Sequence, residues 1–166
     1  VLSNLVYVSA DKSAEFILQL SKIFLYVLDL QNRELVGLEK EVVFAENYLS
    51  LQKIRFEQSL EYFIDVNQMK GWNIPPLSLQ LLLENAIKHN IASMEKPLKI
   101  FIQQTPDSLI VRNNLQPKLT KEVADSGIGL ENIEKRYALL SDKSPKITKT
   151  GTEFIVELPL LNLEKS

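Results

Sequence analysis

The sequence predicts an α+β fold, in which a helical segment precedes a mixed domain of strands and helices. Apolar side chains recur at helical spacing through the first third of the chain, as far as Phe56. From Leu60 onward, short segments rich in aromatic and β-branched residues alternate with helical ones. We therefore divide the chain into a helical segment over residues 1–56 and a mixed domain over residues 57–162.

The composition is that of a folded chain with one substantial core. Of the 166 residues, 45% are apolar and 24% are charged, and the formal net charge is −2. The chain has no basic stripe to neutralise a phosphate backbone, so nucleic acid is not an expected partner. It has no cysteine, which excludes disulfides and thiolate metal sites. Its apolar runs are shorter than the roughly 20 residues that cross a bilayer, so membrane attachment is expected only through parts outside this chain.

Two amphipathic helices are predicted in the first third. The first has an apolar stripe at spacings of three and four, widened by a second stripe: Phe16, Leu20, Ile23, Val27 and Leu30, then Ile17, Phe24 and Leu28. The second repeats this rhythm after a polar break at Gly37, with Leu38, Val42, Ala45 and Leu49. Faces this wide should pack on each other. The residues alone leave two interpretations open, a helical hairpin buried in a monomer and a bundle through which two chains dimerise.

The mixed domain should begin with a strand at EYFIDV. Pro75 and Pro76 suit the start of a helix that continues through LLLENAIKHN, because proline is tolerated in a first turn. LKIFIQQ and SLIVRNN are predicted as antiparallel strands joined by a tight turn at Pro106 and Asp107. A polar stretch, LQPKLTKEVADSG, is typical of a lid and precedes the helix GLENIEKRYALL. PKITK and TEFIVELPL should form the closing strands on either side of Gly151.

Polar residues on the helix LLLENAIKHN are the first candidates for a binding site. Asn85, Lys88 and His89 fall at positions i, i+3 and i+4 and therefore share one face. An amide oxygen beside two cationic or hydrogen-bonding groups suits a metal-bound polyphosphate, since Mg²⁺ takes oxygen ligands. The same spacing also allows Glu84 and Lys88 to form an ordinary surface pair on the helix.

A second candidate is the pair Gly127 and Gly129, which stands immediately before a predicted helix. Backbone N–H groups can approach an anion closely there, and the helix N-terminus favours negative charge. A lone Gly-x-Gly is also common in ordinary loops. The two candidates therefore support a binding site more strongly together than either does alone.

The order of these features resembles one family. From Leu38 to Leu160 the sequence resembles the LytS-like sensor histidine kinases, in the stretches LEKEVVFAENYLSLQKIRF, IPPLSLQLLLENAIKH, SGIGLENIEKRYALL and GTEFIVELPL. The preceding residues resemble the rest of the family's dimerisation segment. The resemblance implies a two-layer α/β sandwich of the Bergerat type, with a mixed, mostly antiparallel sheet and helices on one of its faces. It also implies ATP and Mg²⁺ as cofactors, bound between the helices and the lid.

The resemblance assigns roles to individual residues. Asn85 matches the asparagine that ligates Mg²⁺, and Lys88 and His89 match its phosphate-side neighbours, with Lys88 also neutralising charge in catalysis. Glu84 matches an adjacent family glutamate, for which metal-supporting, proton-handling and structural roles stay open. The other nucleotide-binding residues that it implies lie in the glycine box and the closing Gly-Thr pair: Gly127, Ile128, Gly129, Leu130 and Thr152.

Three departures from the family pattern matter. Asn113 stands where most members have the aspartate that accepts a hydrogen bond from adenine; its amide oxygen can also accept, but without charge assistance. Leu115 replaces a glycine, which removes backbone freedom at the start of the lid. Leu25 replaces an arginine in the dimerisation segment. The family's phosphoacceptor motif, His-Phe-Leu-Phe-Asn, is absent, and the resemblance places the single histidine, His89, in the nucleotide site and not as the acceptor.

The resemblance therefore implies the ATP-binding fragment of a two-component sensor histidine kinase. It would transfer the γ-phosphoryl group to a histidine outside this chain, for relay to the receiver domain of a response regulator. The full-length protein would be a homodimer, and this part would be a cytoplasmic domain of a bacterial inner-membrane protein. Two alternatives are a degenerate, non-catalytic module of the same fold and a different ATPase of the same superfamily, which would not explain the helices before Phe56.

Overall fold

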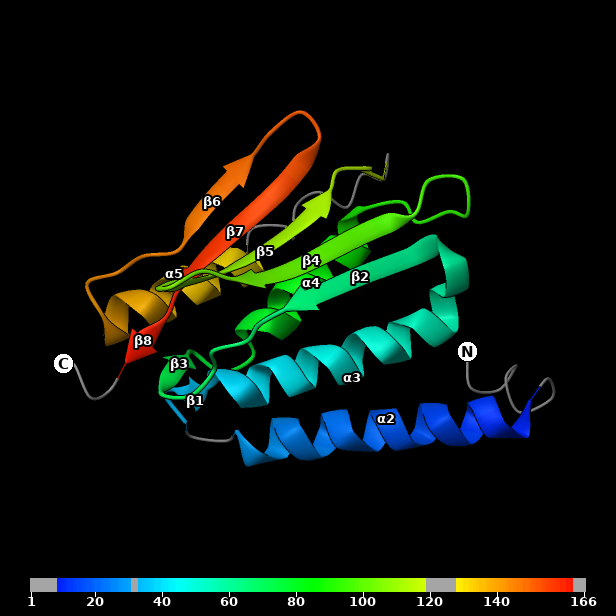
Figure 1. Cartoon of the computed structure of the whole chain (residues 1–166), viewed down its shortest axis with the longest axis horizontal. Helices are drawn as coiled ribbons and strands as arrows, with labels where there is room; N and C mark the ends of the chain where they lie inside the picture. Colours follow the sequence, from blue (N-terminus) through cyan, green and yellow to red (C-terminus); the bar gives the residue numbers. More distant parts are fainter. Residues whose placement is uncertain (1–8, 31–32, 119–127, 163–166) are drawn as a thin grey trace.

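The computed structural model describes residues 9–30, 33–118 and 128–162. Figure 1 shows the arrangement of its elements along the chain. The helices are α2 (Ala10–Asp29), α3 (Leu38–Phe56), α4 (Ser78–His89) and α5 (Ile128–Leu140), and a short 3₁₀ turn spans Glu57–Ser59. The strands are β1 (Val36–Gly37), β2 (Leu60–Asp65), β3 (Trp72–Ile74), β4 (Leu98–Gln104), β5 (Ser108–Asn114), β6 (Lys146–Lys149), β7 (Glu153–Pro159) and β8 (Leu161–Asn162).

The main sheet has the strand order β2-β4-β5-β7-β6. The β2–β4 pair is parallel, and the other three pairs are antiparallel. A tight turn joins β4 to β5, where the backbone N–H of Thr105 donates to the carbonyl of Ser108 at 2.8 Å. The prediction of a mixed, mostly antiparallel sheet with a turn at Pro106 and Asp107 is confirmed.

Helices cover one face of this sheet (Figure 1). Side chains alternate between the faces of a strand, and in β4 the inward-facing residues Leu98, Ile100 and Ile102 are buried. They share one core with apolar residues of α3, α4 and α5. On the opposite face, Phe63 stacks on Phe101 with ring centroids 5.1 Å apart. The two-layer sandwich is therefore confirmed.

Helix α3 lies between α2 and the mixed domain (Figure 1). The rings of Tyr26 on α2 and Phe44 on α3 are 4.9 Å apart, so the predicted packing of the two helices is confirmed. On its other side, α3 buries Val42 and Leu49 in the core that it shares with the sheet. The core thus continues across the division at residues 56 and 57, and that division stays a prediction. The second apolar stripe of α2 is exposed, with Phe24 at 62%.

Two features were not predicted. A second sheet of three short strands has the order β1-β3-β8, with Val36 opposite Ile74 and Asn73 opposite Leu161. Strands of two or three residues are too short to show a periodic pattern, and their partners are distant in sequence. In addition, α4 begins at Ser78, after the buried prolines, and follows a left-handed residue, Leu77, with φ 62°. None of the helices that the structure describes is long and apolar enough to span a membrane.

We expect Leu83→Ala to lower the free energy of unfolding by about 2–5 kcal/mol. Leu83 is on α4 and is fully buried at 0% exposure, so truncation leaves a cavity between the helix and the sheet. Leu139→Ala is the matched control, because Leu139 is 86% exposed on α5, and it should change the free energy by less than about 0.5 kcal/mol. Urea unfolding followed by circular dichroism measures both. Equal effects of the two substitutions would contradict this packing.

Candidate functional site

A cavity of about 310 Å³ lies beside α4, near the end of β5, the start of β7 and the start of α5. Four of the residues predicted to bind nucleotide line it: Asn85, His89, Asn113 and Leu130. Its other lining residues are Ala86, Asn90, Leu115, Pro117, Lys118, Lys149 and Phe154. The volume is at the lower end of the range of small-molecule pockets, about 300–1,000 Å³.

Asn85 lies where α4 meets the start of α5. A Cβ atom built on Gly129 would stand 3.6 Å from Nδ2 and 3.9 Å from Oδ1 of Asn85. Gly129 of the predicted glycine box therefore faces the side chain of the predicted metal ligand. The structure brings these two candidates together across 44 residues of sequence, counted from 85 to 129.

His89 is the second residue of α4 in the cavity. Its Nε2 atom is buried and has no hydrogen-bond partner within the described part of the chain. Burial lowers the pKa of His89 below its ordinary value of 6.5, and the charges of Lys88 and Lys118 lower it further. The imidazole is therefore neutral at neutral pH. A buried polar nitrogen without a partner is costly, so a ligand that hydrogen-bonds to it would gain affinity.

Asn113 provides the polar group at the end of β5. It is buried at 5% exposure and lies opposite Phe154 in the register of β5 and β7. Its side-chain nitrogen donates to the backbone carbonyl of Asn114 at 2.7 Å. The side-chain oxygen is thus the atom with which Asn113 can accept a hydrogen bond from a ligand. Next to the apolar ring of Phe154, this arrangement suits a flat heterocycle that carries an amino group.

The remaining predicted residues lie outside the lining of this cavity. Glu84 accepts a hydrogen bond from Gln80 at 2.8 Å, and Lys88 is exposed. Thr152 is exposed in the turn between β6 and β7, where its carbonyl accepts from the N–H of Leu115 at 2.8 Å. Ile128 begins α5, but nothing is described of its side chain, and Gly127 lies outside the described residues. Their predicted roles stay predictions.

Lys118 and Asn90 were missed by the sequence analysis. The Nζ atom of Lys118 donates to the carbonyls of Ile87 at 3.1 Å and Lys88 at 2.9 Å. Its backbone N–H donates to the carbonyl of His89 at 3.0 Å. These bonds satisfy carbonyl groups at the C-terminal end of α4, where a cation is favoured.

Asn90 fastens the chain after β5 to the same helix end. Its side chain donates to the carbonyl of Ala86 at 2.9 Å and accepts from the N–H of Gln116 at 2.7 Å. Asn90 directly follows His89, so its position in the sequence could have indicated that it lies near the site. Lys118 stands in a polar stretch with no periodicity, and its contact with α4 has no local signal in the sequence.

The protein offers few metal ligands of its own near the cavity. Among the described residues, no group of three or more His, Cys, Asp or Glu side chains could hold a metal ion. The amide oxygen of Asn85 is one acceptable ligand for Mg²⁺, which keeps several waters and binds through substrate phosphates in many proteins. The residues therefore fit a metal ion that arrives with a polyphosphate, and not a metal ion held by protein groups alone.

Comparisons with known proteins show which family this chain is similar to. The sequence model of the histidine kinase family matches residues 1–60. The chain is 32% identical over 155 residues to the sensor protein LytS of Streptococcus agalactiae, which covers 84% of this chain and 26% of that protein. It is 33% identical over 160 residues to LytS of Staphylococcus haemolyticus, which covers 94% of this chain and 25% of the relative. The chain thus spans about a quarter of the length of these curated relatives.

A solved structure shares the fold. The cytoplasmic segment of the histidine kinase QseC aligns with a TM-score of 0.55 over 80% of each chain, at 16% sequence identity. At this identity the likeness concerns the arrangement of helices and strands alone.

We expect the pKa of His89 in the ligand-free chain to lie below its ordinary value of 6.5. Because His89 is the only histidine, its ring protons give a single titration curve by NMR. Lys88→Met should raise the pKa part of the way back, because the Lys88 charge disfavours the imidazolium. Lys143→Met, on the loop after α5, serves as the control and should leave it unchanged. A pKa at or above the ordinary value in the unmodified chain would contradict the burial of the ring.

Proposed function

The chain belongs to the histidine kinase family, and from this premise we propose that it is the ATP-binding part of a two-component sensor kinase. The observation that carries the proposal is the convergence of Asn85, His89 and Asn113 on one cavity, with the backbone of Gly129 against Asn85. These residues come from three separate segments of the chain, and two of those segments, with Asn85 and His89 in one and Gly129 in the other, resemble the family. Their meeting in space is what a shared ligand requires.

The adenine ring would occupy the part of the cavity bounded by Asn113 and Phe154. Asn113 would accept a hydrogen bond from the adenine amino group, and Phe154 would supply an apolar wall. The phosphates would extend toward Asn85 and the start of α5, where the helix N-terminus favours negative charge. Lys118 and Lys149 line the cavity and add positive charge. The cavity thus offers a hydrogen-bond acceptor for the base and positive charges for the phosphates.

Mg²⁺ fits the amide oxygen of Asn85 together with phosphate oxygens. When bound, the ion would neutralise charge on the transferred phosphoryl group. His89 would donate or accept a hydrogen bond at Nε2, the atom that has no partner among the described residues. Lys88 is exposed beside the site, so its flexible side chain could reach a phosphate oxygen. For Glu84, whose carboxylate accepts from Gln80, a role in supporting the metal or handling a proton rests on the family resemblance alone.

The phosphoryl acceptor would be a histidine outside this chain. His89 is the only histidine here, and it lines the cavity itself, so it is suited to nucleotide binding. We propose a homodimer in the full-length protein, in which the acceptor stands on the dimerisation helices, and relay to a response regulator on the cytoplasmic side of the membrane. Phosphoryl transfer asks for positioning and charge neutralisation from the protein and little covalent chemistry.

A degenerate, non-catalytic module is the second candidate, because Asn113 and Leu115 depart from the family pattern. Both residues line the cavity. Asn113 keeps an acceptor oxygen, but a neutral amide is a weaker acceptor than a carboxylate. Leu115 adds an apolar side chain where the family has none. These substitutions favour weakened nucleotide binding, and the phosphate-side residues Asn85 and His89 favour a working site.

We expect the chain to bind a non-hydrolysable ATP analogue with micromolar affinity in the presence of Mg²⁺, as measured by calorimetric titration. Asn85→Ala should remove the dependence on Mg²⁺, because it deletes the metal ligand. Asn113→Asp should tighten binding about fivefold, since it restores charge assistance to the adenine hydrogen bond. Asn67→Ala, in an exposed loop after β2, is the control.

Two outcomes would revise the proposal. If the unmodified chain shows no binding but the Asn113→Asp variant binds, the degenerate module is the better description. If neither binds, the cavity is not a nucleotide site.

A further inference from the structure

The most deeply buried charged side chain that the structure describes is Glu41, and it lies outside the nucleotide cavity. It is on α3 and has 0% exposure. Its Oε1 atom accepts hydrogen bonds from the hydroxyl of Tyr26 at 2.5 Å and the N–H of Leu77 at 2.8 Å. Its Oε2 atom accepts from the N–H of Leu79 at 3.1 Å. Three elements, α2, α3 and the start of α4, therefore meet at one carboxylate.

Burying a carboxylate is costly unless hydrogen bonds replace the lost water. Burial raises the pKa of Glu41, and the hydrogen bonds from Tyr26, Leu79 and Leu77 counteract part of that rise, as does the charge of Arg136. All three bonds place a donor against the carboxylate, so the ionised form is the one that they stabilise. The first N–H groups of a helix lack partners within the helix, and Glu41 supplies one from a neighbouring helix.

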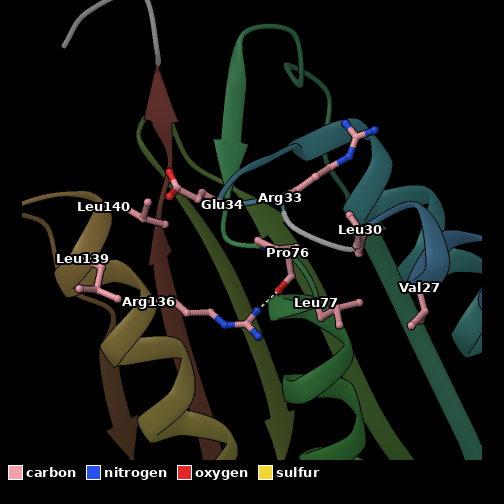
Figure 2. Close-up of a pocket in the computed structure, with 9 residues that line it drawn as sticks. All are labelled: Val27, Leu30, Arg33, Glu34, Pro76, Leu77, Arg136, Leu139 and Leu140. Atoms are coloured by element: carbon pink, nitrogen blue, oxygen red, sulfur yellow. Dashed lines mark hydrogen bonds between the residues drawn. The ribbon is translucent and has the colours of Figure 1, made fainter.

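The backbone at the start of α4 is held in an uncommon conformation. Leu77 has φ 62° and ψ 14°, which is left-handed and unfavourable for a residue with a side chain. Such a conformation persists only where the surroundings impose it. Glu41 binds the N–H groups of Leu77 and Leu79, and Arg136 of α5 donates to the carbonyl of Pro76 (Figure 2). The start of α4 is thus held between α3 and α5.

Helix α4 connects this point to the nucleotide cavity. It is a single helix of 12 residues, with Asn85 in its second half and His89 at its far end. At a rise of about 1.5 Å per residue, Leu79 and His89 are about 15 Å apart along the axis. Because a regular helix moves as a rigid body, a shift or rotation at Leu79 would be passed on to the cavity residues.

The connection to α2 is made by the hydroxyl of Tyr26. Helix α2 packs along α3, and Tyr26 reaches the carboxylate that holds α4. Beside this junction is a cavity of about 630 Å³, lined among others by Val27 of α2 and Leu30 just after it, by Pro76 and Leu77, and by Leu139 (Figure 2). The end of α2 is therefore not packed solidly against α4 and α5. The Tyr26–Glu41 bond is therefore a direct connection from this part of α2 to the residues that hold α4.

We propose that Glu41 is a positioning residue for the nucleotide site, through which Tyr26 couples the helical hairpin to α4. The inference rests on the proposed function, since it assumes that the cavity at the end of α4 binds ATP. Coupling of this kind is reciprocal: if the position of α2 changes the affinity for nucleotide, nucleotide must also change the stability of α2. A residue that merely caps α4 would not show this second effect.

The test uses the whole 166-residue chain, the ATP analogue with Mg²⁺, and the variants Glu41→Gln, Tyr26→Phe and their double. We expect Glu41→Gln to weaken binding about tenfold, within the usual range of coupling between sites. Tyr26→Phe should weaken it about threefold, because it removes one hydrogen bond and leaves the carboxylate in place. The double variant should bind no more weakly than Glu41→Gln, because the hydroxyl acts through the carboxylate. Matched controls are Glu39→Gln, an exposed glutamate of the same helix, and Tyr62→Phe, which loses a hydroxyl contact between β2 and Ser50 of α3. Both should bind as the unmodified chain does.

Hydrogen exchange of α2 separates the two roles of Glu41, because a residue that only caps α4 would leave it unchanged. Nucleotide should slow exchange of the α2 amides around Tyr26 in the unmodified chain and should fail to do so in Glu41→Gln and Tyr26→Phe. If circular dichroism shows that Glu41→Gln does not fold, the result for Tyr26→Phe decides the question. In that variant the carboxylate of Glu41 is still present and still holds α4. Unchanged affinity and unchanged α2 protection in a chain that binds nucleotide would overturn this inference and leave the proposed function standing. Absence of binding in the unmodified chain would overturn both.

Discussion

The structure depends on the burial of one side of α4 between α3 and the inner face of the sheet. Leu79, Leu82, Leu83 and Ala86 form this buried side. Since residues follow one another at about 100° around a helix, the buried side also sets the directions of all other side chains. Asn85 and His89 lie on the flank that borders the cavity, while Lys88 points further out and is exposed. Hydrophobic packing thus decides which polar residues of the helix can meet a ligand.

The cavity contains polar groups that could form further hydrogen bonds with a ligand. The Nε2 atom of His89 is buried without a partner in the described residues, and the oxygen of Asn113 is available as an acceptor. In contrast, carbonyl groups at the end of α4 have hydrogen-bond partners, because Lys118 and Asn90 donate to them. The scaffold is therefore rigid where it holds the site and polar where a nucleotide would bind. Such a division is what preorganised binding sites require.

The start of α4 is as constrained as its end. Glu41 holds it from α3, and Arg136 holds it from α5. Helix α2 is less enclosed, since one of its apolar stripes is exposed and a cavity lies beside its end. Tyr26 joins α2 to the carboxylate that holds the start of α4.

Much of this organisation was determined by the sequence alone. Helical spacing determined α2, α3 and the polar face of α4, and alternation determined the strands of the main sheet, because these patterns involve neighbouring residues. The resemblance in several short stretches indicated Asn85, His89, Asn113 and Leu130 as partners. Only the tertiary structure decided the three-stranded sheet, the placement of Lys118, and the contact of Glu41 with Leu77, which is 36 residues away. A buried carboxylate leaves no local signal, since on α3 it is simply one more glutamate until the fold brings α4 against it.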